Sequence, residues 1–276
     1  GIVVPPVWPE TLTAFARWDY PGNPYYDNRG LKLRAFVTAA VKMIMLTDYF
    51  EQNAEARRAD WNAYQLVTFG STYLGVRDVV PPEAQHAFEA GLLRLGRMMR
   101  EWGVKGEEPN KDLSVPVGLW YAARACGDEV FTADVEAYTR RLLANPQYFH
   151  PAGYWVERGD GLDFGFGGGA NFYAAWLALM TDWPFARETV ERAYRLRAHL
   201  SLPETDGFGT GPSHFNRRVG SPASADQWGW DGARDQAAAM ITDEALPFIK
   251  QPTAEMLSGA GAGRVGWFNS QIKQNP

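Results

Sequence analysis

The residues best suited to chemistry gather in a loop, "DGFGTGPSHFNRR", that runs from Asp206 to Arg218. Three glycines and a proline disfavour a helix here. His214, one of only four histidines in the chain, stands beside an amide and two arginines. The polar and aromatic residues that cluster around it are Asn216, Arg217, Arg218, Trp228 and Trp230. A lone histidine in a loop usually has a structural role. The cluster of polar and aromatic residues around His214 instead favours a functional loop.

Two further loops carry candidate site residues. "GEEPNKDLS" (106–114) places Asn110 and Asp112 at the start of an apolar helix, where they serve as caps or, for Asn110, face a cavity. The stretch from His150 to Tyr173 has six glycines between Gly159 and Gly169. It is too long for a plain connector, and "GYWVE" within it predicts one strand of a short hairpin. Its candidates are Tyr154, Trp155, Arg158, Asp160, Asp163, Asn171 and Tyr173.

The elements that must position these loops are helices. Apolar spacing of three and four residues predicts them over 28–52, 59–76, 81–103, 110–128, 129–145, 167–183, 184–201 and 231–249. Apolar helices alternate with amphipathic ones, which is typical of a two-layer ring. We therefore expect an all-α fold, an incomplete α/α toroid, with an irregular helical bundle as the alternative. We expect a single catalytic domain over 1–276, with an N-terminal extension at 1–28 and a peripheral tail at 252–276.

Composition narrows the function. The net charge of −5 and the lack of a Lys/Arg run argue against nucleic acid as a partner. The longest apolar stretch, 35–46, contains Lys42 and is too short to span a bilayer. Neither an HExxH, a CxxC nor a GxSxG motif occurs, so we expect no metal, no cofactor and no serine hydrolase elbow. The start at Gly1 suggests a processed chain, secreted or periplasmic, whose signal peptide is gone.

Aromatic residues are abundant, with 11 Trp, 12 Tyr and 15 Phe. They form either a core built of large rings or an aromatic-lined cleft. Sugar rings have apolar faces that stack on Trp and Tyr, so such a cleft suits a carbohydrate.

The order of these features resembles the α/α-toroid polysaccharide lyases, which include chondroitin AC, hyaluronate and alginate lyases. The shared features are the alternating helices, "NKDLS" at an inner-helix start, a "GYW…GDG…GGGANFY" loop and an arginine-bearing loop. The resemblance covers most of 60–235 and is one of layout. It implies an anionic polysaccharide as substrate and cleavage by β-elimination.

The resemblance also implies roles for residues. Asn110 matches the family's inner-helix asparagine, Tyr173 or Tyr154 its tyrosine, and Arg217 or Arg218 its arginine. The family's histidine precedes the tyrosine in the glycine-rich loop, where this chain has none after His150, so His214 would serve from another place. Asparagine and arginine would neutralise the uronate carboxylate, and tyrosine and histidine would act as acid and base. Tyr154, Arg158, Asn171, Asn216, Arg217, Trp228 and Trp230 would bind substrate.

Two other functions remain open at this point. An inverting glycoside hydrolase needs two carboxylates about 6.5–9.5 Å apart, for which Glu157, Asp160 and Asp163, with Asp226 opposite, are candidates. A non-catalytic glycan-binding domain would keep the aromatic residues but tolerate loss of His214.

Overall fold

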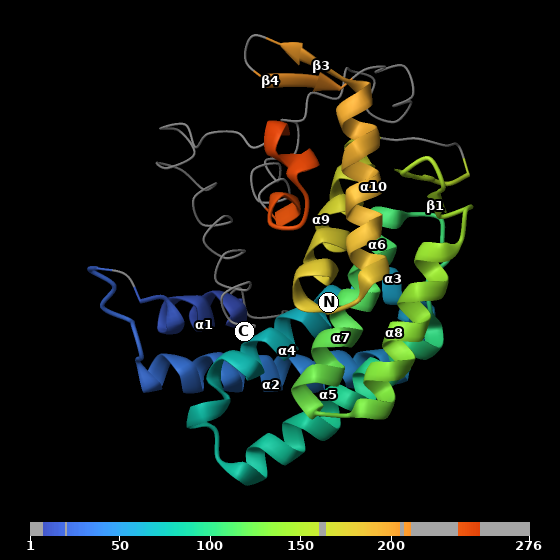
Figure 1. The fold of residues 1–276 in the computed structure, drawn as a ribbon. Helices are drawn as coiled ribbons and strands as arrows, with labels where there is room; N and C mark the ends of the chain where they lie inside the picture. Colours follow the sequence, from blue (N-terminus) through green and yellow to red (C-terminus); the bar gives the residue numbers. More distant parts are fainter. Residues whose placement is uncertain (1–7, 20, 160–163, 205–206, 211–236, 249–276) are drawn as a thin grey trace. The chain divides into compact units, whose positions relative to one another are not determined.

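The structure is a computed structural model and describes residues 8–19, 21–159, 164–204, 207–210 and 237–248. The described chain is mostly helical, which confirms the expected all-α class (Figure 1). The helices are α1 (Pro9–Arg17), α2 (Arg29–Gln52), α3 (Ala59–Asn62), α4 (Tyr64–Val76), α5 (Pro82–Trp102), α6 (Pro109–Asp112), α7 (Ser114–Cys126), α8 (Glu129–Ala144), α9 (Phe164–Met180) and α10 (Pro184–Leu200). The remaining elements are η1 (Ala54–Ala56), η2 (Arg77–Val79), β1 (Phe149–His150), β2 (Tyr154–Trp155), β3 (Ser201–Glu204), β4 (Gly207–Thr210) and η4 (Asp243–Phe248).

The chain divides into two compact units. The first comprises Gly1–Val104, Val115–Val135 and Asn269–Pro276, and the second comprises Lys105–Ser114 and Glu136–Phe268. In the part of the chain that the structure describes, no helix has both the length and the hydropathy of a bilayer span.

The first unit is built around α2, which packs against α1 and α4 (Figure 1). The helix begins after Asn28, whose side-chain oxygen accepts a hydrogen bond from the Leu31 amide at 2.9 Å, as the sequence predicts for an Asn cap. Phe36, Met43 and Phe50 are spaced seven residues apart and form one buried face. The apolar period thus positions the core of this unit.

Small residues let α7 approach the junction between α3 and α4. The sequence predicts one helix over 59–76, but the structure separates α3 from α4 at Ala63. A Cβ atom built on Gly118 would lie 2.4 Å from the Ala63 carbonyl oxygen. Only a glycine at position 118 allows this approach of α7 to the backbone.

Cys126 ends α7 and is half-buried. Its thiol donates a hydrogen bond to the Glu89 carbonyl oxygen, with the sulfur 3.2 Å away. Burial, reinforced by the negative charge of Glu89, raises the pKa of the thiol to about 12. The thiolate, which is the nucleophilic form, is therefore scarce at neutral pH.

The second unit is centred on α9, which packs against α6 and α10. The expected hairpin is present as β1 and β2, which are antiparallel and pair His150 with Tyr154. Gly153 turns this hairpin with a φ of 97°, a conformation that side chains disfavour. Strands β3 and β4 form a second antiparallel pair.

Three further elements differ from the prediction. Helix α1 lies in the stretch 1–28, which shows no clear apolar period because α1 buries small and polar residues. Helix α9 begins at Phe164 rather than at 167, so the glycines from 165 to 169 are helical. Burial of the apolar helix outweighs their low helix propensity. Within the described part of 231–249, a short 3-10 helix, η4, ends the segment in place of one continuous helix.

Candidate functional site

Five predicted site residues lie in the described ranges, and all five belong to the second unit: Asn110, Tyr154, Arg158, Asn171 and Tyr173. The other six, His214, Asn216, Arg217, Arg218, Trp228 and Trp230, lie outside the described residues, as do Asp160, Asp163 and Asp226. The geometry of the site is therefore built from α6, the β1–β2 hairpin and α9.

Asn110 lies on the side of α6 that meets α9. A Cβ atom on Gly169 would lie 3.1 Å from the Cβ atom of Asn110, so the two backbones approach closely. The N-cap residue of α6 is Glu108 rather than Asn110 or Asp112, and its backbone N–H donates to Asp112 Oδ2 at 3.1 Å. The Asn110 Oδ1 atom is buried and accepts no hydrogen bond from any described residue. A buried amide oxygen in this state favours a ligand that brings a donor.

Tyr173 shares a face of α9 with Gly169, because residues four positions apart lie above one another on a helix. The phenol ring lies nearly parallel to Trp176, with ring centroids 6.4 Å apart and planes 6° apart. Burial raises the pKa of Tyr173 to about 12. The hydroxyl is therefore protonated at neutral pH, which suits a proton donor. Asn110 and Tyr173 thus line the same side of α9.

Asn171 lies on the other side of α9, since residues two positions apart point in nearly opposite directions. Its Oδ1 accepts a hydrogen bond from Trp155 Nε1 at 2.7 Å, and both residues are buried. Gly167, one turn earlier, also faces Trp155, whose Cδ1 would be 3.6 Å from a Cβ atom there. Asn171 fixes the hairpin to α9 rather than presenting its amide oxygen to a ligand.

The hairpin pairs Tyr154 with His150, a residue that sequence reasoning left ambiguous. Their rings stack at 4.4 Å with planes 13° apart. His150 Nδ1 accepts a hydrogen bond from the Ala152 amide at 3.1 Å, which assigns the proton of the neutral ring to Nε2. The signal for this pair was the spacing "HPAGY", because a proline and a glycine between the rings predict a tight turn that brings them face to face.

Arg158 is exposed and forms an ion pair with Glu108. Its backbone N–H donates to the Glu107 carbonyl oxygen at 2.7 Å. Lys111 Nζ donates to the same Glu108 carboxylate at 2.5 Å. Burial opposes ionisation of Glu108, but the hydrogen bonds from Lys111 and Arg158 outweigh it and lower its pKa to about 2. Arg158 therefore anchors the segment after the hairpin to α6.

This pKa predicts acid sensitivity. The folded-state pKa of Glu108 lies below its ordinary value of 4.5, so its contribution to stability is full above that value and is lost as pH falls towards 2. We expect Glu108→Gln to shrink the difference in free energy of unfolding between about pH 7 and about pH 3, measured by urea titration. Glu136→Gln, which removes an exposed partner of Arg140, is the control and should leave that difference unchanged. Equal pH dependence in wild type and Glu108→Gln would contradict the assignment.

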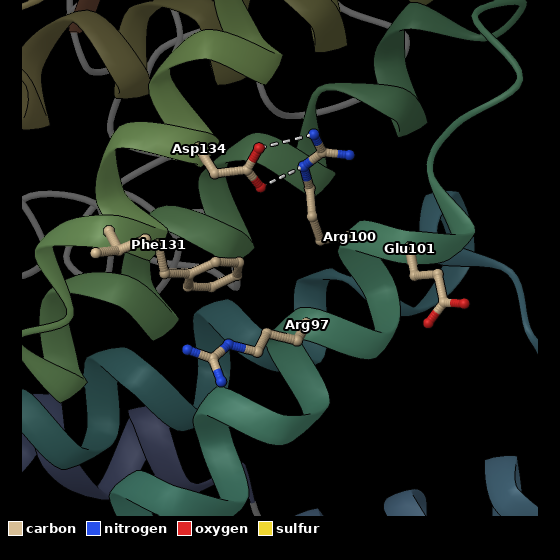
Figure 2. Close-up of a pocket in the computed structure, with 6 residues that line it drawn as sticks. Arg97, Arg100, Glu101, Phe131 and Asp134 are labelled. Atoms are coloured by element: carbon tan, nitrogen blue, oxygen red, sulfur yellow. Dashed lines mark hydrogen bonds and ion pairs between the residues drawn. The ribbon is translucent and has the colours of Figure 1, made fainter.

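A surface pocket of about 370 Å³ lies in the first unit, between α5 and the start of α8. Figure 2 shows Arg100 and Asp134 facing each other across it, with the Arg100 Nε atom 2.9 Å from Asp134 Oδ2. Arg97 pairs with Asp128 at 2.8 Å. The guanidinium groups are thus neutralised by carboxylates and hold α5 to α8. None of the predicted site residues lines this pocket.

Within the described ranges, no group of three His, Cys, Asp or Glu side chains is placed to hold a metal ion. Comparison of the chain with protein-family models, curated proteins and solved structures gave no match.

Proposed function

We propose that this chain is a polysaccharide lyase that cleaves a uronic-acid-containing polymer by β-elimination, on a fold of the α/α-toroid kind. The observation that carries the proposal is that Asn110 meets α9 at Gly169, on the face of that helix that also carries Tyr173. An amide with an unpartnered buried oxygen lies there with a protonated phenol. A hydrogen-bonding amide and a proton donor are the two groups that elimination from a uronate requires.

In the proposed reaction, a base removes the proton from the carbon next to the uronate carboxylate. The electron pair of that C–H bond forms a carbon–carbon double bond, and the glycosidic C–O bond breaks. The Asn110 amide N–H donates to the carboxylate and stabilises the enolate-like charge, while its buried oxygen accepts a hydrogen bond from a hydroxyl of the sugar. Tyr173 gives its proton to the leaving oxygen. His214 is the proposed base, and Arg217 and Arg218 complete the neutralisation of the carboxylate.

The test is an ultraviolet absorbance assay on alginate, glucuronan, hyaluronan, chondroitin and xanthan. The new double bond is conjugated with the carboxylate, so elimination gives a rising signal. The polymer that gives this signal identifies the substrate. A flat trace on all five polymers would reject the proposal.

A second candidate function is an inverting glycoside hydrolase, and the observation that favours it is the buried carboxyl group of Glu157. This carboxyl is buried just after the hairpin, 5% exposed. Burial raises the pKa of Tyr148, and the negative charges of Asp112 and Glu157 add to this effect. Hydrolysis would release new reducing ends without ultraviolet absorbance, which separates it from elimination. Binding of a polymer with neither product would indicate a glycan-binding domain.

A further inference from the structure

Five large aromatic side chains are exposed within a short stretch of the first unit. Trp8, Phe15, Trp18, Tyr25 and Tyr26 are each between 40% and 50% exposed. We call this set the aromatic surface. Large aromatic side chains are usually buried in the core of a protein. An exposed group of five of them therefore indicates a binding surface.

Helix α1 buries small and polar residues and exposes a large aromatic one, the reverse of the usual amphipathic pattern. The side that packs on α2 and α4 buries Glu10, Thr13 and Ala14, which are polar or small. Phe15 is exposed on the outer side of the helix, and the part-exposed rings of Trp8 and Trp18 flank its two ends. The three residues span the length of α1, a stripe about 15 Å long at 1.5 Å per residue. Folding of the unit alone does not explain why the large rings face outward.

Hydrogen bonds between the Asn23 side chain and backbone groups hold the rest of the aromatic surface against this stripe. The Asn23 side chain donates to the carbonyl oxygens of Phe15 and Trp18, at 2.8 and 2.7 Å. Its own oxygen accepts the Tyr25 amide at 3.0 Å. The Tyr25 ring then meets Phe15 edge-on, with centroids 6.0 Å apart. The rings are therefore arranged before any ligand arrives, which lowers the entropic cost of binding.

Two arginines lie next to the aromatic surface in the sequence and have no acidic partner among the described residues. Arg17 and Arg29 form no ion pair with any described residue. Asp27 and Asp78 share Lys32, at 2.6 and 2.8 Å, so both are already paired. Asp19 is a further exposed acid close to Arg17 in the sequence. Arg17 and Arg29 can therefore pair with acidic groups that a ligand brings.

We propose that the aromatic surface binds an anionic polysaccharide, with sugar rings stacked on Trp8, Phe15, Trp18, Tyr25 and Tyr26 and with acidic groups next to Arg17 and Arg29. Flat rings with a polar edge match the apolar faces and hydroxyl rims of pyranoses. A stripe about 15 Å long takes more than one sugar in line. The acidic class of polymer rests on the proposed function, whereas the stacking does not.

The experiment is affinity electrophoresis of the full chain in native gels that contain alginate, glucuronan, hyaluronan, chondroitin or xanthan. We expect at least one polymer to retard the wild type. The double variant Trp18→Ala/Tyr26→Ala should raise the dissociation constant about tenfold or more, equal to about 1.4 kcal/mol. Tyr49→Ala is the matched control, because Tyr49 is an exposed tyrosine of the same unit outside the aromatic surface. Circular dichroism confirms that each variant is folded.

The charges are tested in the same gels. Arg17→Gln/Arg29→Gln should weaken retardation and reduce its dependence on salt, whereas Arg124→Gln, a change at an exposed arginine on α7, should not.

No retardation by any of the five polymers would overturn the inference, as would equal retardation of the wild type and the aromatic double variant. It would also be overturned if that double variant instead lost concentration-dependent dimerisation or binding to phosphatidylserine vesicles. The experiments distinguish failure of the proposed lyase activity from failure of the proposed aromatic surface. Retardation without an unsaturated product rejects the lyase and keeps the aromatic surface. An unsaturated product with retardation equal in the double variant does the reverse.

Discussion

Gly118→Ala is expected to lower the free energy of unfolding by about 2 kcal/mol, even though alanine is the better helix former. The added methyl group would lie 2.4 Å from the Ala63 carbonyl oxygen and 3.1 Å from the Leu66 Cβ atom. Both contacts involve atoms on or next to the backbone, so neither can rotate away. Relief requires a shift of α7 from the α3–α4 junction and leaves poorer packing behind.

Urea unfolding monitored by circular dichroism measures this effect, with Gly91→Ala as the matched control. Gly91 is also a helical glycine of the first unit, but a methyl group there would meet only the flexible end of Met43, at 2.8 Å. Gly91→Ala should therefore be neutral or stabilising, by up to about 1 kcal/mol. If both variants lost the same stability, the close approach at position 118 would not be the cause.

Tyr173→Phe is expected to reduce kcat of the proposed lyase by about 10²–10⁴. The change removes one oxygen atom and with it the proton for the leaving glycosidic oxygen, while the ring that stacks on Trp176 stays. Initial rates of ultraviolet absorbance on the responsive polymer give kcat and KM. His214→Ala should cause a loss of similar size if His214 is the base.

Two checks distinguish a chemical role from a structural one. Tyr194→Phe, at a fully buried tyrosine of α10, controls for loss of a phenol elsewhere in the unit and should retain kcat. A proton donor must be protonated to act, and burial holds the pKa of Tyr173 at about 12. The fall in kcat/KM at high pH should therefore come near 12 rather than near the ordinary tyrosine value of about 10, and Tyr173→Phe should lack it. Unchanged activity in Tyr173→Phe would remove Tyr173 from the mechanism.

The sequence predicts most helices because their apolar periods reflect a single buried face. Asn28 and the spacing of Phe36, Met43 and Phe50 define α2 correctly. The same rule fails for α1, where the buried side is polar and small and the apolar residues face outward. It also misplaces the start of α9, since the glycine run has low intrinsic helix propensity and becomes helical through burial in the second unit. Contacts between different elements cannot be predicted from the residues of one short stretch of sequence.

The sequence predicts residue types for the candidate site but not the partners that these residues have in the structure. Spacing alone does not predict the hydrogen bond between Trp155 and Asn171 or the ion pair between Arg158 and Glu108. Each partner lies on another element and at least sixteen residues away along the chain. The stack of His150 on Tyr154 could be predicted from the sequence, because a four-residue spacing around a proline and a glycine is a local signal of a tight turn. The toroid arrangement stays a prediction.

The state of Cys126 makes the chain convenient for labelling. It is the single cysteine, and its thiol has a pKa of about 12. Maleimides react with thiolates, so the native chain should take up such reagents slowly. A cysteine introduced at an exposed position, for example by Tyr26→Cys, would then be the dominant site of modification. A fluorophore or spin label attached there would report directly on what comes to lie against α1.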